Sequence, residues 1–146
     1  MTAKEYLSKV HTYRRAIRTT QQRLDELYTM ASGVKAITYD KDRVQVSPEN
    51  RFEAFMAQID EEAEKMSRQI ARYQREAAKR QRQIAELSKP EYSEVLELRY
   101  IETDKNGCQY TLEQISHMMH LSFHRVAHLH GEALLEFDRK YKVSKQ

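Results

Sequence analysis

Glycine and proline are scarce in this chain of 146 residues, which has three glycines and two prolines. A β-sandwich or β-barrel needs many turns, so this scarcity argues against both architectures. Gly33, Gly107 and Gly131 lie too far apart to form a glycine-rich loop that holds a nucleotide phosphate. The single cysteine, Cys108, excludes an internal disulfide framework and is typical of a reducing compartment.

Long apolar runs are also missing. No stretch approaches the roughly 20 residues that a membrane-spanning helix needs, and the N-terminus leads into no apolar segment of a secretory signal. The chain has no nucleophile elbow, zinc-protease helix or phosphate-binding loop, so we expect neither an enzyme nor a bound cofactor. These features favour a cytoplasmic protein without a membrane contact. A net charge of +3 permits nucleic-acid binding without requiring it.

Helical periodicity, by contrast, is plain in the first third of the chain. Its apolar residues are spaced alternately four and three apart, the spacing of a coiled-coil seam. They are Tyr6, Val10, Tyr13, Ile17, Thr20, Leu24, Leu27 and Ala31, of which only Thr20 is clearly polar. The pair Ser32-Gly33 is the expected end of this helix, because glycine tolerates the left-handed conformation that ends helices. β-Branched residues in segments 36–39 and 43–46 then predict a short strand hairpin.

A second, longer helix is predicted from Ser47-Pro48-Glu49 to about Leu87. Serine can cap a helix, proline suits its first position, and glutamate suits its positive end. The seam of this helix is Phe52, Met56, Ile59, Ala63, Met66, Ile70, Tyr73, Ala77, Arg80, Ile84 and Leu87, with Arg80 as the only break. Such a helix must bury its stripe against the first helix, as an antiparallel hairpin, or against a second copy of the chain. We expect residues 1–89 to form this coiled-coil hairpin and to serve oligomerisation.

Charge divides along the second helix. Residues 53–64 carry five acidic and no basic residues, whereas residues 65–90 carry eight basic and two acidic residues. The solvated face of a coiled coil explains this division, and so does an end of the helix that faces nucleic-acid phosphates. The sequence leaves both interpretations open.

The C-terminal part of the chain predicts three shorter helices. Pro90 ends the long helix, and a helix over residues 91–102 follows. Thr111 is the expected cap of a helix that runs to about Met119, and Ser122 is the expected cap of one that begins at Phe123. The turn of about three residues between them is typical of a helix-turn-helix. The last helix should bury its residues at spacings of three and four, which are Val126, Leu129, Ala133 and Phe137.

These segments resemble region 4 of bacterial sigma factors, the region that reads promoter DNA. The resemblance is carried by Val95–Tyr100, Thr111–Ser116, Leu121-Ser122, Arg125-Val126 and Ala133-Leu134. The chain also resembles small bacteriophage transcriptional regulators, similar to the RinA and ArpU activators, through Val44–Pro48 and the long helix after it, Arg99-Tyr100 and Leu129–Leu134. His120 stands where the sigma pattern usually has glycine, and a left-handed conformation would strain it.

The resemblance implies an all-α protein, with a DNA-binding domain over residues 90–146 that follows the hairpin. It implies a phage-type regulator that binds double-stranded DNA, as a homo-oligomer, in the cytoplasm of a bacterial host. The residues expected at the DNA are Thr111 and Ser122 near phosphates, and Phe123, His124, Arg125 and His128 at the bases. Arg125 alone can hold a guanine with two hydrogen bonds. Two alternatives stay open: a small terminase-like subunit that recognises DNA for packaging, and an interaction protein that grips RNA polymerase.

Five of the six histidines crowd this C-terminal region, and His120, His124 and His128 are each four apart. Such spacing can bind a metal ion where one helix continues through the residues. Ser122 is expected to break the helix between the first two, so we expect no metal site.

Overall fold

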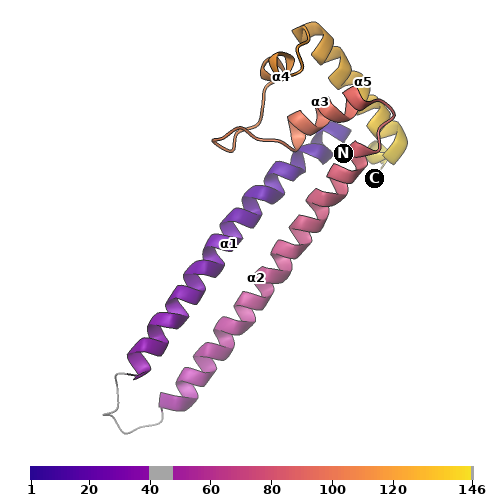
Figure 1. Ribbon diagram of the computed structural model, residues 1–146. Helices are drawn as coiled ribbons and strands as arrows, with labels where there is room; N and C mark the ends of the chain where they lie inside the picture. Colours follow the sequence, from indigo (N-terminus) through magenta and orange to yellow (C-terminus); the bar gives the residue numbers. More distant parts are fainter. Residues whose placement is uncertain (40–47, 146) are drawn as a thin grey trace. The chain divides into compact units, whose positions relative to one another are not determined.

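The structure is a computed structural model that describes residues 1–39 and 48–145. All regular elements of this part of the chain are helical, which confirms the predicted all-α class (Figure 1). They are α1 (Ala3–Tyr39), α2 (Pro48–Ala85), α3 (Pro90–Tyr100), α4 (Leu112–Met118), α5 (Phe123–Tyr141) and the short 3₁₀-helix η1 (Val143–Lys145). None of the described helices is both long and apolar enough to cross a membrane.

The chain divides into two compact units. Unit 1 comprises Met1–Arg14 and Arg75–Gln146, and unit 2 comprises Arg15–Gln74. Helices α1 and α2 therefore each contribute residues to both units. Residues distant in sequence share unit 1, because its N-terminal segment packs with the C-terminal half of the chain.

Unit 2 contains an apolar cluster shared by α1 and α2. Its buried members are Leu24, Ala63 and Ile70, with Ile17, Leu27 and Met66 partly buried against them. All six are residues of the predicted seams. Every predicted seam residue, in unit 1 as in unit 2, is buried or half-buried. The spacing of four and three thus identified the packed faces of both long helices correctly.

The predicted end of the first helix is wrong, because α1 continues past Gly33 to Tyr39. Among the described glycines only Gly107 has a positive φ, so Gly33 does not adopt the left-handed conformation of a helix end. A glycine inside a helix costs only about 1 kcal/mol relative to alanine, which a long helix tolerates. The strand expected at 36–39 is also wrong, since this segment is helical. The expected strand at 43–46 and the cap Ser47 lie outside the described residues.

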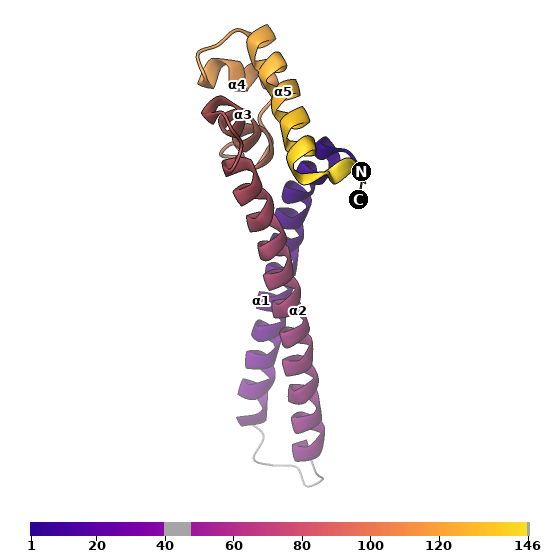
Figure 2. The same cartoon turned by 90° about the vertical axis from the view of Figure 1, so that its right-hand side faces the viewer.

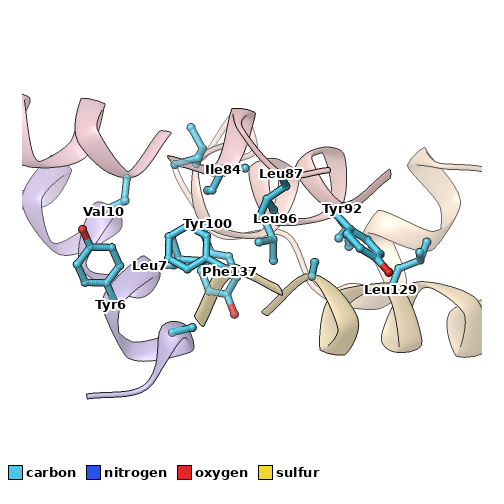
Figure 3. Close-up of a cluster of buried hydrophobic side chains, with 14 of the residues drawn as sticks. Tyr6, Leu7, Val10, Ile84, Leu87, Tyr92, Leu96, Tyr100, Leu129 and Phe137 are labelled. Carbon is cyan, nitrogen blue, oxygen red and sulfur yellow. The ribbon is translucent and has the colours of Figure 1, made fainter. Parts of the chain in front are cut away.

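In unit 1, helices α3, α4 and α5 pack on one another (Figures 1 and 2). Their apolar core also takes in the first turns of α1 and the last turns of α2 (Figure 3). Among the side chains that the structure describes, Phe137 of α5 is the largest that is fully buried, and its ring centroid lies 6.0 Å from that of Tyr6 in α1. Leu7 of α1 is 0% exposed and Ile84 of α2 is 1% exposed. The three short helices are therefore fixed to the ends of the two long ones.

Arg80, the one charged residue of the predicted seams, is buried in unit 1. Its guanidinium lies 4.0 Å from the centroid of the Tyr6 ring, and its Nε donates to the Tyr6 carbonyl at 3.0 Å. Nη1 donates to the carbonyl and to the carboxylate Oε2 of Glu76, both at 2.8 Å, while Nη2 donates to the Tyr13 hydroxyl at 3.4 Å. Arg80 thus interrupts the apolar pattern while its donors find partners on both α1 and α2.

Candidate functional site

The candidate site is formed by α4, α5 and the turn between them. Thr111 caps α4, as predicted, in a reciprocal pair with Gln114. The Gln114 backbone N–H donates to Thr111 Oγ1 at 3.2 Å, and the Thr111 N–H donates to Gln114 Oε1 at 2.9 Å. Ser122 caps α5, also as predicted, by accepting a hydrogen bond from the Arg125 N–H at 3.2 Å. Both caps satisfy backbone donors that a helix start leaves without partners.

The turn has the hydrogen-bond pattern of a Schellman motif. The Leu121 N–H donates to the Ser116 carbonyl at 3.0 Å, and the His120 N–H donates to the His117 carbonyl at 3.3 Å. His120 has a φ of 55°, in the left-handed region that glycine usually occupies in this motif. The strain expected at His120 is therefore present, and the turn keeps its geometry without a glycine.

Burial fixes which faces of the two helices are free. The four predicted core residues of α5, Val126, Leu129, Ala133 and Phe137, are all buried. The buried residues of α4 are Ile115 and Ser116, which form its inner face. The adjoining face of α3 has the buried residues Tyr92, Val95, Leu96 and Tyr100. The opposite side of the first turns of α5 is left to solvent.

Every residue that the sequence assigned to the site is exposed. His124, Arg125 and His128 lie on the first two turns of α5, beside Phe123, which is 50% exposed. The rings of Phe123 and His124 meet edge to face, with centroids 6.1 Å apart. The caps Thr111 and Ser122 are exposed as well. The α5 residues of the predicted set thus share one accessible helix start, and Ser122 caps it.

Two glutamates, which the sequence-based prediction left out, contact this set. Glu91 of α3 forms an ion pair with Arg125, in which Oε2 of Glu91 lies 3.5 Å from Nη2 of Arg125. Both side chains are about half exposed. Glu132 of α5 lies 3.4 Å from Nδ1 of His128 and accepts a hydrogen bond from the Tyr92 hydroxyl at 2.9 Å. The spacing of His128 and Glu132, four residues apart on one helix, could have revealed the second contact. The first depends on how α3 packs against α5, and no local signal encodes it.

Among the described residues, no group of three or more His, Cys, Asp or Glu side chains is placed to hold a metal ion. Of the three exposed histidines, His120 lies in the turn between α4 and α5, whereas His124 and His128 lie on α5, so no single helix runs through all three. The surface therefore offers hydrogen-bond donors, one arginine and one aromatic ring to a partner.

Behind the exposed face, the buried Tyr100 and the partly buried His130 form a polar contact. The Tyr100 hydroxyl and His130 Nε2 are 2.9 Å apart, and the two rings stack with centroids 5.8 Å apart. Burial, together with the positive charges of Arg99 and Lys4, lowers the pKa of His130 to about 4. Burial raises the pKa of Tyr100 to about 12. Both side chains are neutral at pH 7, and the contact joins α3 to α5.

Acid should destabilise unit 1 through His130. The pKa of this side chain rises from about 4 in the folded chain to about 6.5 on unfolding, so the unfolded chain binds more protons between these two values. The free energy of unfolding therefore falls as the pH is lowered from about 6.5 towards 4. Because the ring is only partly buried, solvent screening limits the expected loss to about 1–2 kcal/mol.

Urea titrations at about pH 4.5 and about pH 7 check this expectation. His130→Gln retains a hydrogen-bonding group near Tyr100 but cannot titrate, so it should lose less stability than the wild type on acidification. His117→Gln, on the exposed face of α4, is the matched control and should behave as the wild type. An acid loss in His130→Gln equal to that of the wild type would exclude His130 as its source.

No protein-family model matches the chain, and no curated protein or solved structure matches it either.

Proposed function

We propose that this chain is a phage-type transcriptional regulator that binds double-stranded DNA through a helix-turn-helix. In this proposal α4 supports the fold, the Schellman turn sets the angle between the helices, and α5 enters the major groove. The observation that carries the proposal is the start of α5. Its buried residues hold it against α3 and α4, while His124, Arg125 and His128 stand exposed on its first two turns.

Arg125 is the residue that we assign to base reading. A guanidinium can donate two hydrogen bonds to the O6 and N7 atoms of guanine, and the histidines can each make one. Arg125 is held by Glu91 in the free protein. An ion pair between half-exposed side chains stabilises a protein by only about 0–1 kcal/mol, so DNA can replace Glu91 at small cost. On DNA where Arg125 does not contact a guanine, the negative charge of Glu91 then repels the phosphates.

The long helices support an oligomerising hairpin in the same proposal. In unit 1, Tyr6 of α1 contacts Gln83 of α2 at 3.0 Å, and Tyr13, further along α1, contacts Arg80, which precedes Gln83 in α2. This order is that of antiparallel helices. We propose that the resulting coiled coil joins copies of the chain, because paired reading helices match paired half-sites in DNA. The resemblance to sigma region 4 and to phage activators belongs to this proposal too.

Arg125→Ala should weaken binding to a preferred duplex, selected from a random pool, by about 1–3 kcal/mol. It should also relax the preference at one base pair, because an alanine cannot hold guanine. Fluorescence anisotropy with the selected and a scrambled duplex measures both effects. Arg23→Ala, an exposed arginine of α1 in unit 2, is the control and should leave the preference unchanged. Unaltered affinity and unaltered preference in Arg125→Ala would remove Arg125 from the reading surface.

A second candidate function is an interaction protein that binds RNA polymerase. Met118 and Phe123 flank the turn and are 44% and 50% exposed. Large apolar side chains of this kind anchor protein interfaces. Binding of purified polymerase by the wild type, lost in Phe123→Ala while duplex binding is absent in both, would favour this candidate.

A further inference from the structure

A cationic surface lies on the last turns of α2, away from the candidate site. Arg75, Lys79 and Arg82 are spaced four and three apart, so their side chains project from one face of the helix. All three are exposed. The seam residues Ala77, Arg80 and Ile84 face the interior instead. The three cations cover about 10 Å along the helix axis.

The acidic side chains of this stretch are held by other groups of unit 1. Glu76 binds the buried Arg80 through Oε2 at 2.8 Å. Glu86 accepts a hydrogen bond from the Tyr141 hydroxyl at 2.6 Å. Within the described part of the chain, no ion pair of 4.0 Å or less involves Arg75, Lys79 or Arg82. Their charges are therefore available to an external anion.

Lys140 of α5 extends the surface. Its ammonium donates to the backbone carbonyl of Glu86, one turn beyond Arg82. An ammonium has three donors, so Lys140 keeps donors for a ligand while the contact fixes its position. Arg75, Lys79, Arg82 and Lys140, here called the basic face, thus come from two helices of unit 1.

We propose that the basic face binds the phosphate backbone of duplex DNA without reading its sequence. Guanidinium and ammonium groups at regular rises along a helix suit a regular row of phosphates, and each contact releases a counterion. The neighbouring exposed residues Ala78, Gln81 and Ala85 are small or polar. The face therefore lacks the large apolar side chains that insert into a membrane surface or anchor a protein interface.

The choice of DNA over RNA rests on the proposed function, since unit 1 also carries the proposed reading helix. The two surfaces share no residue. Arg125→Ala should change sequence preference and leave binding to a scrambled duplex nearly intact. Loss of the basic face should weaken binding to every duplex. An experiment can therefore contradict the role of one surface without contradicting the role of the other.

The test compares the full chain with a triple variant, Arg75→Gln, Lys79→Gln and Arg82→Gln, on a scrambled DNA duplex over a range of salt concentrations. Loss of three phosphate contacts should make the negative slope of log K against log salt less steep by about 2–3 units. It should also weaken binding roughly 10²–10³-fold at about 0.1 M salt. The control triple variant, Arg15→Gln, Arg18→Gln and Arg23→Gln, removes the same charge from exposed positions of α1. It should leave the slope within about half a unit of the wild type.

Four further measurements decide the remaining outcomes. Circular dichroism verifies the fold. Each single glutamine variant should make the negative slope less steep by about one unit, which keeps the test available if the triple variant misfolds. Equal losses in both triple variants would overturn the proposal, because net charge alone would then explain them. Tighter binding to an RNA duplex of the same sequence would overturn it in favour of RNA. Binding to vesicles rich in phosphatidylserine, without binding to duplex DNA, would overturn it in favour of a membrane surface.

Discussion

Replacing Arg80 by alanine should lower the free energy of unfolding of unit 1 by about 3–5 kcal/mol, while replacing it by methionine should change it by less than about 1 kcal/mol. Alanine leaves a cavity between the rings of Tyr6 and Tyr13, which now lie 4.0 and 5.0 Å from the guanidinium carbon. It also removes two hydrogen bonds that join α2 to α1, those from Arg80 to the Tyr6 carbonyl and to the Tyr13 hydroxyl. Methionine fills a similar volume without a buried charge.

The reason for the contrast is the cost of burying a charge. The side chain of Arg80 is only 4% exposed, whereas that of its partner Glu76 is 42% exposed. Dehydrating the guanidinium costs several kcal/mol, and Glu76, the carbonyls and the aromatic rings offset most of this cost. When methionine replaces Arg80, Glu76 can turn to water. Net stability therefore changes little, although several interactions have disappeared.

Equilibrium unfolding in urea, followed by hydrogen exchange to assign the loss to unit 1, measures both variants. Glu76→Ala serves as the complementary variant and should be destabilising, because it leaves the buried cation without its carboxylate. A methionine variant as unstable as the alanine variant would show that the polar contacts of Arg80, rather than its volume, hold α1 and α2 together.

Local sequence signals predicted much of the fold. Alternating spacings of four and three identified the buried faces of α1 and α2, since side chains that recur at helical period must share a face. The caps Thr111 and Ser122 were predicted from residue type, because a serine or threonine hydroxyl at the start of a helix accepts a hydrogen bond from a backbone N–H of the first turn. The predicted end of α1 at Gly33 was wrong, because a glycine permits a helix end without requiring one.

Contacts between elements that are distant in the chain could not be predicted from the sequence. Two partners of Arg80, Tyr6 and Tyr13, lie on α1, and the Glu91 partner of Arg125 lies on α3, so these contacts depend on how the helices pack. The same holds for the candidate site. Residue types and spacing predicted its exposed set on α5, but not the acidic side chains that modify its charge. Its role in DNA binding stays a prediction that the Arg125 variant tests.

Leu7→Ala should destabilise unit 1 by about 2–5 kcal/mol. Leu7 lies outside the predicted seam of the first helix, which contains its neighbour Tyr6, yet it is 0% exposed. It belongs to the core that includes Leu96 of α3 and Phe137 of α5 (Figure 3). Truncation to alanine leaves a cavity where three helices meet, and the loss grows with the volume that the neighbours fail to fill.

Leu135→Ala is the matched control for this variant, because it makes the same change at a side chain that is 68% exposed. It should alter stability by no more than about 0.5 kcal/mol. Urea unfolding gives the difference, and hydrogen exchange should show faster exchange of the α3 and α5 amides in Leu7→Ala. If the two variants were equally stable, the first turns of α1 would contribute nothing to the core of unit 1. Faster exchange of α3 and α5 would instead mean that a residue in the second turn of α1 supports the proposed reading helix from more than a hundred residues away in sequence.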